Sequence, residues 1–159
     1  MSNRRHIREL AIQALYQLDA RGVGDLVDVE RSIMDAPHAE QTKRDGLDLA
    51  RRAWAVHEKC DELTMKLAPD WPTHRQPPVD KSILRLAYYE IVSGAAPVAV
   101  AINEAIELAK EFGSERSPAF INGVLDKVAK TVRENPTEAS PAPTDTQAWL
   151  NDAMEDKKP

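Results

Sequence analysis

The stretch from Asp80 to Lys127 limits the fold most strongly, because it contains three helix-like segments with clear start and stop signals. In each segment apolar residues recur every three or four positions, which is the pattern of an amphipathic helix. Gly94 and Gly113 follow the first and second segments, where glycine commonly ends a helix. Pro97 and Pro118 stand where a first-turn proline is tolerated. Three such helices with short connections bury their apolar faces only by packing on one another, so the stretch predicts a helical core.

The ends of these helices are predicted from residues that favour helix starts. Asp80 is the expected N-cap of the first helix, and Ser117, directly before Pro118, is the expected N-cap of the third. The spacing of apolar residues predicts that Val98 and Phe112 face inward from the two ends of the second helix. The first helix is expected to bury one apolar stripe.

Gly123 lies well inside the third predicted helix, where glycine costs about 1 kcal/mol relative to alanine. A glycine at such a position indicates that something approaches the backbone closely. One explanation is a tight contact with another helix. The other is a surface at which Phe120 stacks on a ligand and Asn122 hydrogen-bonds to it. The local sequence leaves both explanations open.

The remaining sequence predicts further helices on either side of a proline-rich connection. Apolar spacing indicates an N-terminal helix to about residue 20, a short helix near 25–34 and a longer helix over about 40–67. Gly46 lies inside the longest of these and favours a later start. Four prolines within residues 69–78 mark an ordered loop or linker between two helical halves. We therefore predict an all-α fold.

Composition divides the chain into a helical domain, residues 1–134, and an acidic, proline-rich tail, residues 135–159. The whole chain is 42% hydrophobic and 30% charged, as expected of a globular protein. The segment PTEASPAPT, in contrast, has the composition of a disordered linker, so the tail is predicted to be partly disordered. Trp149, Leu150 and Met154 follow it and indicate docking on the body or on a partner; the choice between these stays open.

The net charge of −5 is distributed unevenly. Residues 134–159 contain six acids and two lysines, whereas residues 1–16 contain three arginines and one glutamate. A nearly neutral body with a basic N-terminal end is compatible with binding a phosphate backbone. No segment approaches the roughly 18 consecutive apolar residues of a membrane span. The single cysteine, Cys60, excludes an internal disulfide and indicates a reducing cytoplasm.

A second stripe runs along the N-terminal helix beside its apolar face and consists of Arg5, Arg8, Ile12 and Tyr16. Arginine pairs with phosphates and stacks on bases, and tyrosine offers a stacking face that tolerates any base. The stripe is therefore a candidate site for single-stranded nucleic acid. The alternative is a solvated basic turn with Tyr16 half-buried in the core.

Candidate catalytic residues form no recognisable constellation. His57 and Cys60 lie one helical turn apart, but no further ligand stands at metal-binding spacing, and a structural role is favoured. Glu104 and Glu107 are also one turn apart on a face that carries other charges, which favours a solvated, ion-paired surface. No glycine-rich phosphate loop, nucleophile elbow or dinucleotide fingerprint is present. We therefore expect no catalytic activity, no metal and no cofactor.

Three segments together resemble the NusB family of bacterial transcription antitermination factors. They are RRHIRELAIQALYQLD, DKSILRLAYYEI and AAPVAVAINEAIELAKEFGSERSPAFINGVLDKVAK, in the order and spacing of the family. The resemblance implies two three-helix bundles with about seven helices and no catalysis. It also implies binding to the boxA element of rRNA operon leaders together with the ribosomal protein NusE. Other Nus factors and RNA polymerase complete the antitermination complex that the resemblance implies, and no membrane is involved.

The resemblance assigns roles to individual positions. Residues matching family positions near RNA are Arg4, Arg5, Arg8, Tyr16, Phe120 and Asn122. Residues matching positions near the ribosomal partner are Asp80, Lys81, Arg85 and Arg116.

Two departures from the family pattern affect these assignments. The family commonly has arginine-alanine-arginine where this chain has His6-Ile7-Arg8, so one basic contact with RNA is expected to be missing. The family often has an acid where this chain has Arg116, which changes the expected partner contact.

Three hypotheses therefore enter the structural comparison. The first is an RNA-binding antitermination factor, which the resemblance favours. The second is a helical adaptor that binds only proteins, and the third is an enzyme whose site the sequence does not reveal. A preference for boxA-like RNA over scrambled RNA separates the first from the second.

Overall fold

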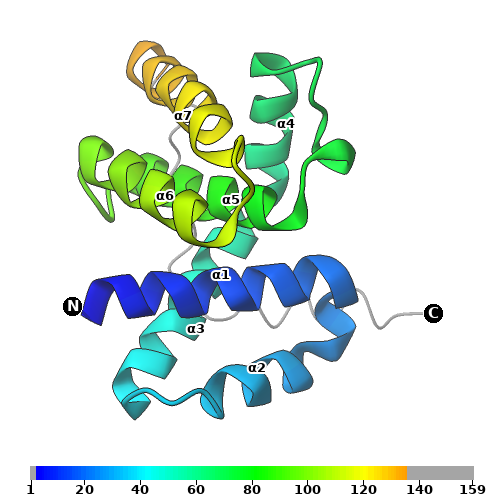
Figure 1. Ribbon diagram of the computed structural model, residues 1–159, viewed down its shortest axis with the longest axis vertical. Helices are drawn as coiled ribbons and strands as arrows, with labels where there is room; N and C mark the ends of the chain where they lie inside the picture. Colours follow the sequence, from blue (N-terminus) through cyan, green and yellow to red (C-terminus); the bar gives the residue numbers. More distant parts are fainter. Residues whose placement is uncertain (1–2, 136–159) are drawn as a thin grey trace.

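The computed structural model describes residues 3–135. Within this range the chain forms seven α-helices and two short 3-10 helices (Figure 1). Their bounds are α1 (Asn3–Arg21), η1 (Val23–Asp25), α2 (Leu26–Met34), α3 (Glu40–Ala55), α4 (His57–Leu67), η2 (Thr73–Arg75), α5 (Pro78–Ser93), α6 (Val98–Phe112) and α7 (Ser117–Glu134). The predicted tail, including Trp149, Leu150 and Met154, lies outside the described residues from residue 136 onward.

The helices form two bundles that meet across α1 and α5 (Figure 1). Helices α1, α2 and α3 pack together as the lower bundle in that view, and α5, α6 and α7 form the upper one. Helix α4 lies beside α5 and α7. The predicted all-α fold of two three-helix bundles is thus confirmed. None of the helices within residues 3–135 is both long enough and apolar enough to cross a membrane.

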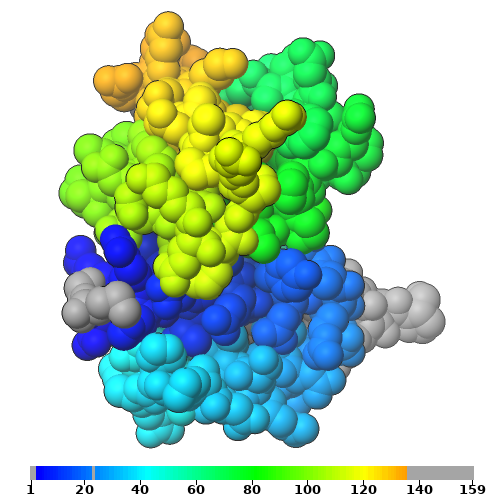
Figure 2. Space-filling view, viewed as in Figure 1, coloured from blue at the N-terminus to red at the C-terminus, as the bar shows by residue number. Residues whose placement is uncertain are grey.

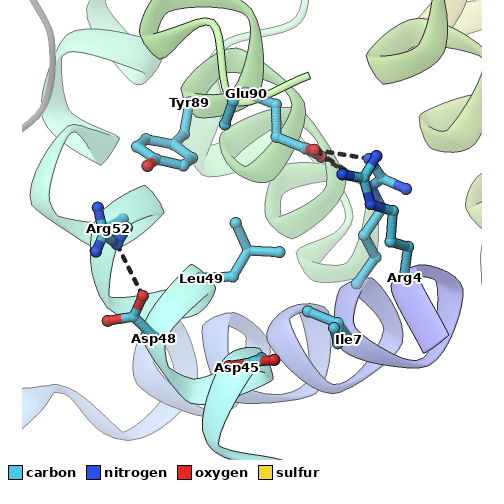
Figure 3. A pocket seen from close by; sticks show the side chains of 10 residues that line it. Arg4, Ile7, Asp45, Asp48, Leu49, Arg52, Tyr89 and Glu90 are labelled. Carbon is cyan, nitrogen blue, oxygen red and sulfur yellow. Dashed lines mark hydrogen bonds and ion pairs between the residues drawn. The ribbon is translucent and has the colours of Figure 1, made fainter. Parts of the chain in front are cut away.

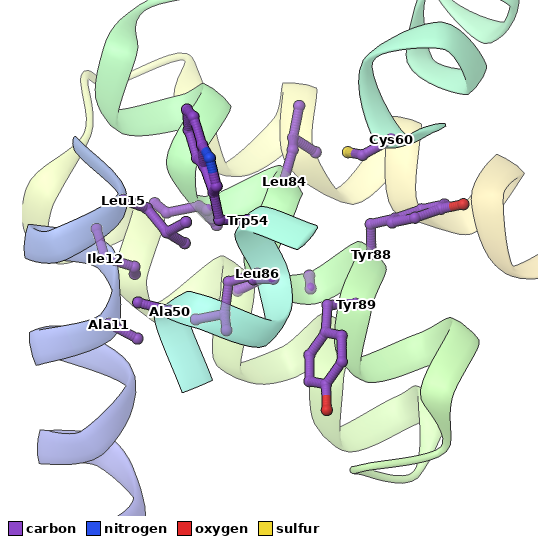
Figure 4. Close-up of a cluster of buried hydrophobic side chains, with 14 of the residues drawn as sticks. Ala11, Ile12, Leu15, Ala50, Trp54, Cys60, Leu84, Leu86, Tyr88 and Tyr89 are labelled. Carbon is purple, nitrogen blue, oxygen red and sulfur yellow. The ribbon is translucent and has the colours of Figure 1, made fainter. Parts of the chain in front are cut away.

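Helix α5 is the centre of the core, because α1, α3, α4, α6 and α7 all contact it. Every residue from Ser82 to Val92 is buried. Figure 4 shows Leu84, Leu86, Tyr88 and Tyr89 of this helix among apolar side chains from the surrounding helices. The prediction of a single buried stripe was therefore wrong, since a helix between two bundles is covered on all sides.

Two charged residues of α5 are buried and paired with distant parts of the chain. Arg85 donates from Nη1 to Asp19 Oδ1 at 2.9 Å and from Nη2 to Asp61 Oδ2 at 2.6 Å. Glu90 lies 2.9 Å from Nη2 of Arg8 on α1. A buried charge without a partner costs several kcal/mol, so these pairs restrict how α1 and α4 are placed against α5.

The predicted helix over 40–67 is two helices. It breaks at Val56, whose φ of −114° and ψ of 10° are not helical. The break allows α3 to pack on α1 while α4 packs on α5 and α7. Local apolar spacing does not reveal such a break, because both halves continue the same period.

Helix starts also differ from the predicted caps by a few residues. The N-cap of α5 is Pro77, so Asp80 lies in the first turn and is buried instead of capping. The N-cap of α7 is Arg116, and Ser117 is its first residue. The Ser117 hydroxyl still accepts a hydrogen bond, from the backbone N–H of Ser114 at 2.9 Å.

Both ends of α6 extend beyond the core. Val98 is 40% exposed and Phe112 is 42% exposed, so the prediction that they face inward was wrong. The buried residues of α6 lie between them: Ala101, Ala105, Leu108 and Ala109. The repeat of apolar residues continues to both ends of α6, but the neighbouring helices cover only its middle part.

The glycines inside helices serve different purposes. A Cβ at Gly46 would lie 2.8 Å from Leu10 Cβ and 3.3 Å from the Ile7 carbonyl oxygen, so this glycine lets α3 approach α1 closely. Helix α3 begins at Glu40 and continues through Gly46, so the expected later start was wrong. A Cβ at Gly123 would meet nothing within 4 Å, which excludes the tight-contact explanation for that glycine.

The same substitution is expected to have opposite effects at these two positions. Gly123→Ala should raise the free energy of unfolding by about 1 kcal/mol, because alanine favours the helix and space is free. Gly46→Ala should lower it by about 1–3 kcal/mol, because the added methyl overpacks the α1–α3 contact. Urea unfolding of the two variants tests this. Equal stabilisation by both would contradict the close approach of α1 and α3.

The cluster around Arg85 predicts a pH dependence of stability. Burial alone would raise the pKa of Asp19, but hydrogen bonds from Lys81 and Arg85 outweigh it and lower the pKa below its ordinary value. A carboxylate with a lowered pKa stabilises the fold above its unfolded-state pKa of about 3.9, and this contribution is lost as the pH falls through the folded-state pKa.

Asp19→Asn should therefore cost about 1.5–3 kcal/mol at neutral pH, the value of hydrogen bonds to a charged group. The difference from the unsubstituted protein should shrink in acid below about pH 4. Urea unfolding at a series of pH values measures it, with Asp126→Asn on the exposed side of α7 as the control. A loss that is independent of pH would argue against the ion pairs as its cause.

Candidate nucleic-acid interface

The stripe predicted on α1 faces α5 and α6. In Figure 1 helix α6 lies above α1, and Arg5 near the start of α1 contacts Glu104 of α6. Farther along α1, Ile12 and Tyr16 line a groove with Phe112 at the end of α6. The exposed part of the stripe therefore borders the seam between the two helices, with Arg5 toward one end and Tyr16 toward the other.

Arg5 is held by α6 but remains accessible. Its Nε and Nη2 groups donate to the Glu104 carboxylate at 3.1 to 3.3 Å, and its side chain is 35% exposed. Hydrogen bonding to Glu104 raises the pKa of Arg5 above its ordinary value. Among the described residues no partner binds the Nη1 group, so that edge of the guanidinium can meet a phosphate.

Arg8 lies in the interior. It is 6% exposed, and its Nε and Nη2 groups donate to Glu90 at 2.9 to 3.3 Å. Burial alone would lower the pKa of Arg8, but the paired carboxylate of Glu90 reverses the effect. The structure thus places Arg8 in the buried contact between α1 and α5. There its ion pair with Glu90 helps to fix the position of α1 against α5.

Arg4 is exposed on another side of α1. It borders an open pocket of about 460 Å³ between α1, α3 and the end of α5 (Figure 3). The pocket contains both signs of charge, since Arg52 donates to Asp48 at 2.8 Å and Glu90 lies at its wall. Arg4 and Arg5 therefore point to different surfaces, as expected for consecutive helical residues.

Tyr16 is 43% exposed and stands at the edge of an apolar groove of about 400 Å³. The groove lies between α1, the start of α5 and the end of α6. Its lining residues are Ile12, Gln13, Tyr16, Gln17, Val79 and Phe112. Neither Phe112 nor Val79 was predicted as a site residue. Helical spacing had assigned Phe112 to the core, and the sequence analysis gave Val79 no role.

Phe120 and Asn122 lie on opposite flanks of α7, each about 100° from the buried Ile121. Phe120 is half-buried, and its ring packs edge-on against Trp71 at 6.3 Å between centroids. Asn122 is exposed beside the open backbone of Gly123. The two residues therefore do not form one contact, although both border the start of α7.

The residues predicted to meet the ribosomal partner are mostly covered. Burial raises the pKa of Asp80, which is 3% exposed, and its Oδ1 atom has no hydrogen-bond partner within residues 3–135. Lys81 Nζ lies 2.9 Å from Asp19, and Arg85 is 4% exposed. Arg116 is exposed at the start of α7. Of the four, Arg116 is the one that presents a full side chain to a partner.

The candidate catalytic residues have structural surroundings. Burial raises the pKa of the Cys60 thiol strongly, which disfavours the reactive thiolate. The His57 ring stacks on Trp54 at 3.8 Å between centroids, and its Nδ1 hydrogen-bonds to the Trp54 carbonyl oxygen. Across residues 3–135 no three His, Cys, Asp or Glu side chains are grouped to hold a metal. Glu104 and Glu107 pair with Arg5 and Lys110.

Comparisons with known proteins agree with this architecture. The sequence model of the NusB family matches residues 5–130. The transcription antitermination protein NusB of Herpetosiphon aurantiacus is 43% identical over 135 residues, which cover 80% of this chain and 90% of that protein. A solved structure of NusB from T. maritima has a TM-score of 0.71 and 32% identity, covering 93% of this chain and 96% of that one.

A second solved structure has the same fold at lower identity. It is a crystal structure of the antitermination factors NusB and NusE in complex with dsRNA, with a TM-score of 0.68 and 24% identity. The match covers 82% of this chain and 98% of that one. Because the family model spans nearly all of residues 3–135 and the first relative exceeds 40% identity over most of its own length, this chain belongs to the NusB family.

Proposed function

We propose that the protein is a transcription antitermination factor that binds boxA-type RNA of rRNA operon leaders together with the ribosomal protein NusE. The observation that carries the proposal is the family match over residues 5–130, with a relative named as a transcription antitermination protein at 43% identity. The structure of NusB and NusE with dsRNA, which has the same fold, supports it. The bound complex, with other Nus factors, makes transcription by RNA polymerase more processive. In this proposal the protein acts in the cytoplasm by binding RNA and protein, without catalysing a reaction.

The seam between α1 and α6 and the exposed flank of α7 together supply chemistry that suits unpaired RNA. Arg5 offers the free edge of its guanidinium to a phosphate while Glu104 holds its orientation. Tyr16 offers an exposed ring at the border of the apolar groove, where a base can stack. Asn122 offers an amide that pairs with a base edge. In this proposal Arg4 adds a positive charge that attracts RNA over a longer distance. Phe120 offers an aromatic ring on the flank of α7 opposite Asn122.

Arg8 has an indirect role in the same proposal. Its ion pair with Glu90 attaches the basic end of α1 to α5 and so orients Arg5 and Tyr16 along the seam. The ribosomal partner binds near the starts of α5 and α7, where Arg116 is exposed. Asp80, Lys81 and Arg85 lie beneath that surface and set the position of α5. Residues 1–134 form the binding domain, and the acidic tail lies outside it.

Substitutions on the seam and on α7 should separate phosphate contacts from base contacts. Arg5→Ala should weaken binding to all RNAs alike and reduce the slope of log K against log salt by about 1, because one phosphate contact is lost. Tyr16→Ala should weaken binding roughly tenfold by loss of stacking, and Asn122→Ala should reduce the preference for boxA over scrambled RNA. Fluorescence anisotropy with labelled RNA, with and without the ribosomal partner, measures these effects.

The matched control is Arg31→Ala, an exposed arginine on α2, outside the seam, which should leave both affinity and salt slope unchanged. Equal affinity of the partner-loaded protein for boxA and scrambled RNA would refute specific recognition. The adaptor hypothesis would then be favoured.

A further inference from the structure

Trp71, Arg75 and Phe120 form a surface cluster that the sequence analysis did not identify, here called the aromatic ledge. Trp71 is 40% exposed although it is a large apolar residue. Its ring meets Phe120 edge-on at an interplanar angle of 67°, and the Arg75 guanidinium carbon lies 5.9 Å from its centroid. The ledge thus combines a partly exposed indole ring with a cation over it.

The segment that carries the ledge is held in place by hydrogen bonds. The Trp71 backbone N–H donates to the Ala68 carbonyl at 3.0 Å, and the buried Gln76 side chain donates to the Trp71 carbonyl at 3.2 Å. Lys127 of α7 donates to the Leu67 carbonyl at 3.3 Å, which ties the end of α4 to the same helix as Phe120. A ring positioned in advance loses little conformational entropy when a ligand stacks on it.

Arg75 has no ion pair within residues 3–135, in contrast to three arginines described above. Arg5, Arg8 and Arg85 are each paired with a carboxylate. The exposed Asp70 is nearby in sequence but does not pair with it. An unpaired, exposed arginine beside an aromatic face can neutralise a phosphate without first breaking an internal ion pair.

The aromatic ledge continues the proposed RNA surface. Residues 73–75 form η2, which leads directly into α5, where Val79 lines the same groove as Tyr16 and Phe112. Phe120 belongs to the first turns of α7, which follows the end of α6 after a short connection. Figure 2 shows the yellow surface of the α6 end and α7 start bordering both blue α1 and the green segment that precedes α5.

We propose that the aromatic ledge binds one further unpaired nucleotide of the RNA, with its base stacked on Trp71 and its phosphate paired with Arg75. This inference rests on the proposed RNA-binding function and extends it beyond the seam between α1 and α6. Base stacking on an aromatic residue tolerates any base, so the ledge adds affinity for longer RNA without adding sequence preference. Its contribution appears only when the RNA is long enough to reach from the groove to Trp71.

The test compares Trp71→Leu, Trp71→Tyr and Arg75→Gln by anisotropy, using boxA-like RNAs that are lengthened stepwise at either end. Trp71→Leu keeps apolar contact with Phe120 but lacks a ring, so it should lose about tenfold affinity for long RNA and nothing for the shortest. Trp71→Tyr should retain most of the affinity. Arg75→Gln should reduce the salt slope by about 1 on long RNA alone.

Val27→Ala, at an exposed apolar residue of α2, is the matched control and should change nothing. Urea unfolding of each variant separates loss of folding from loss of binding. The proposal is overturned if Trp71→Leu binds long RNA as tightly as the unsubstituted protein while both prefer boxA; the proposed function then survives. It is also overturned if Trp71→Leu weakens only the binding of the ribosomal partner in the absence of RNA.

A second readout tests the aromatic ledge independently of boxA. Stacking of oligouridylate on Trp71 should quench tryptophan fluorescence in a Trp149→Phe background, and Trp71→Tyr should abolish the quenching. Trp54 does not interfere, because it is buried and stacked on His57. Quenching by oligouridylate without any preference for boxA would support the ledge and refute the proposed function. Quenching that persists in Trp71→Tyr would refute the ledge.

Discussion

The structure depends on the burial of charged groups along α5. This helix lies between the two bundles, so Arg85 and Glu90 are almost fully buried and need partners inside the protein. Arg85 bridges Asp19 at the end of α1 and Asp61 on α4, and Glu90 holds Arg8 near the start of α1. Both ends of α1 are therefore attached to one helix. Because an uncompensated buried charge is costly, these pairs give the two bundles a unique relative placement.

The same pairing decides how much positive charge remains at the surface. Arg8 contributes to the core, and Arg5 shares its guanidinium with Glu104, so the seam between α1 and α6 carries less free positive charge than its sequence implies. Phosphate contacts alone give such a surface little affinity for RNA, since each neutralised phosphate needs a free cation. Stacking groups and a protein partner are the natural sources of the remaining affinity.

The exposed aromatic side chains come from separate elements and meet in two groups, Tyr16 with Phe112 and Trp71 with Phe120. Tyr16 comes from α1, Phe112 from the end of α6, Phe120 from α7 and Trp71 from the connection before α5. Tyr16 is exposed along α1. The other three lie near the end of a helix or in a connection, where the neighbouring helices cover them less. Both bundles therefore provide aromatic side chains that are carried by packed helices and their connections.

The sequence by itself determined the helical class, most helix limits, the glycine stop at Gly94 and the identity of the family, because these depend on local spacing and motif order. Only the tertiary structure decided that α5 is buried on every side, that Gly46 lies against α1, and that Trp71 meets Phe120. Arg8 illustrates the reason. Its place in the helical period was clear, but its partner Glu90 is 82 positions away, and local spacing carries no information about such a pairing.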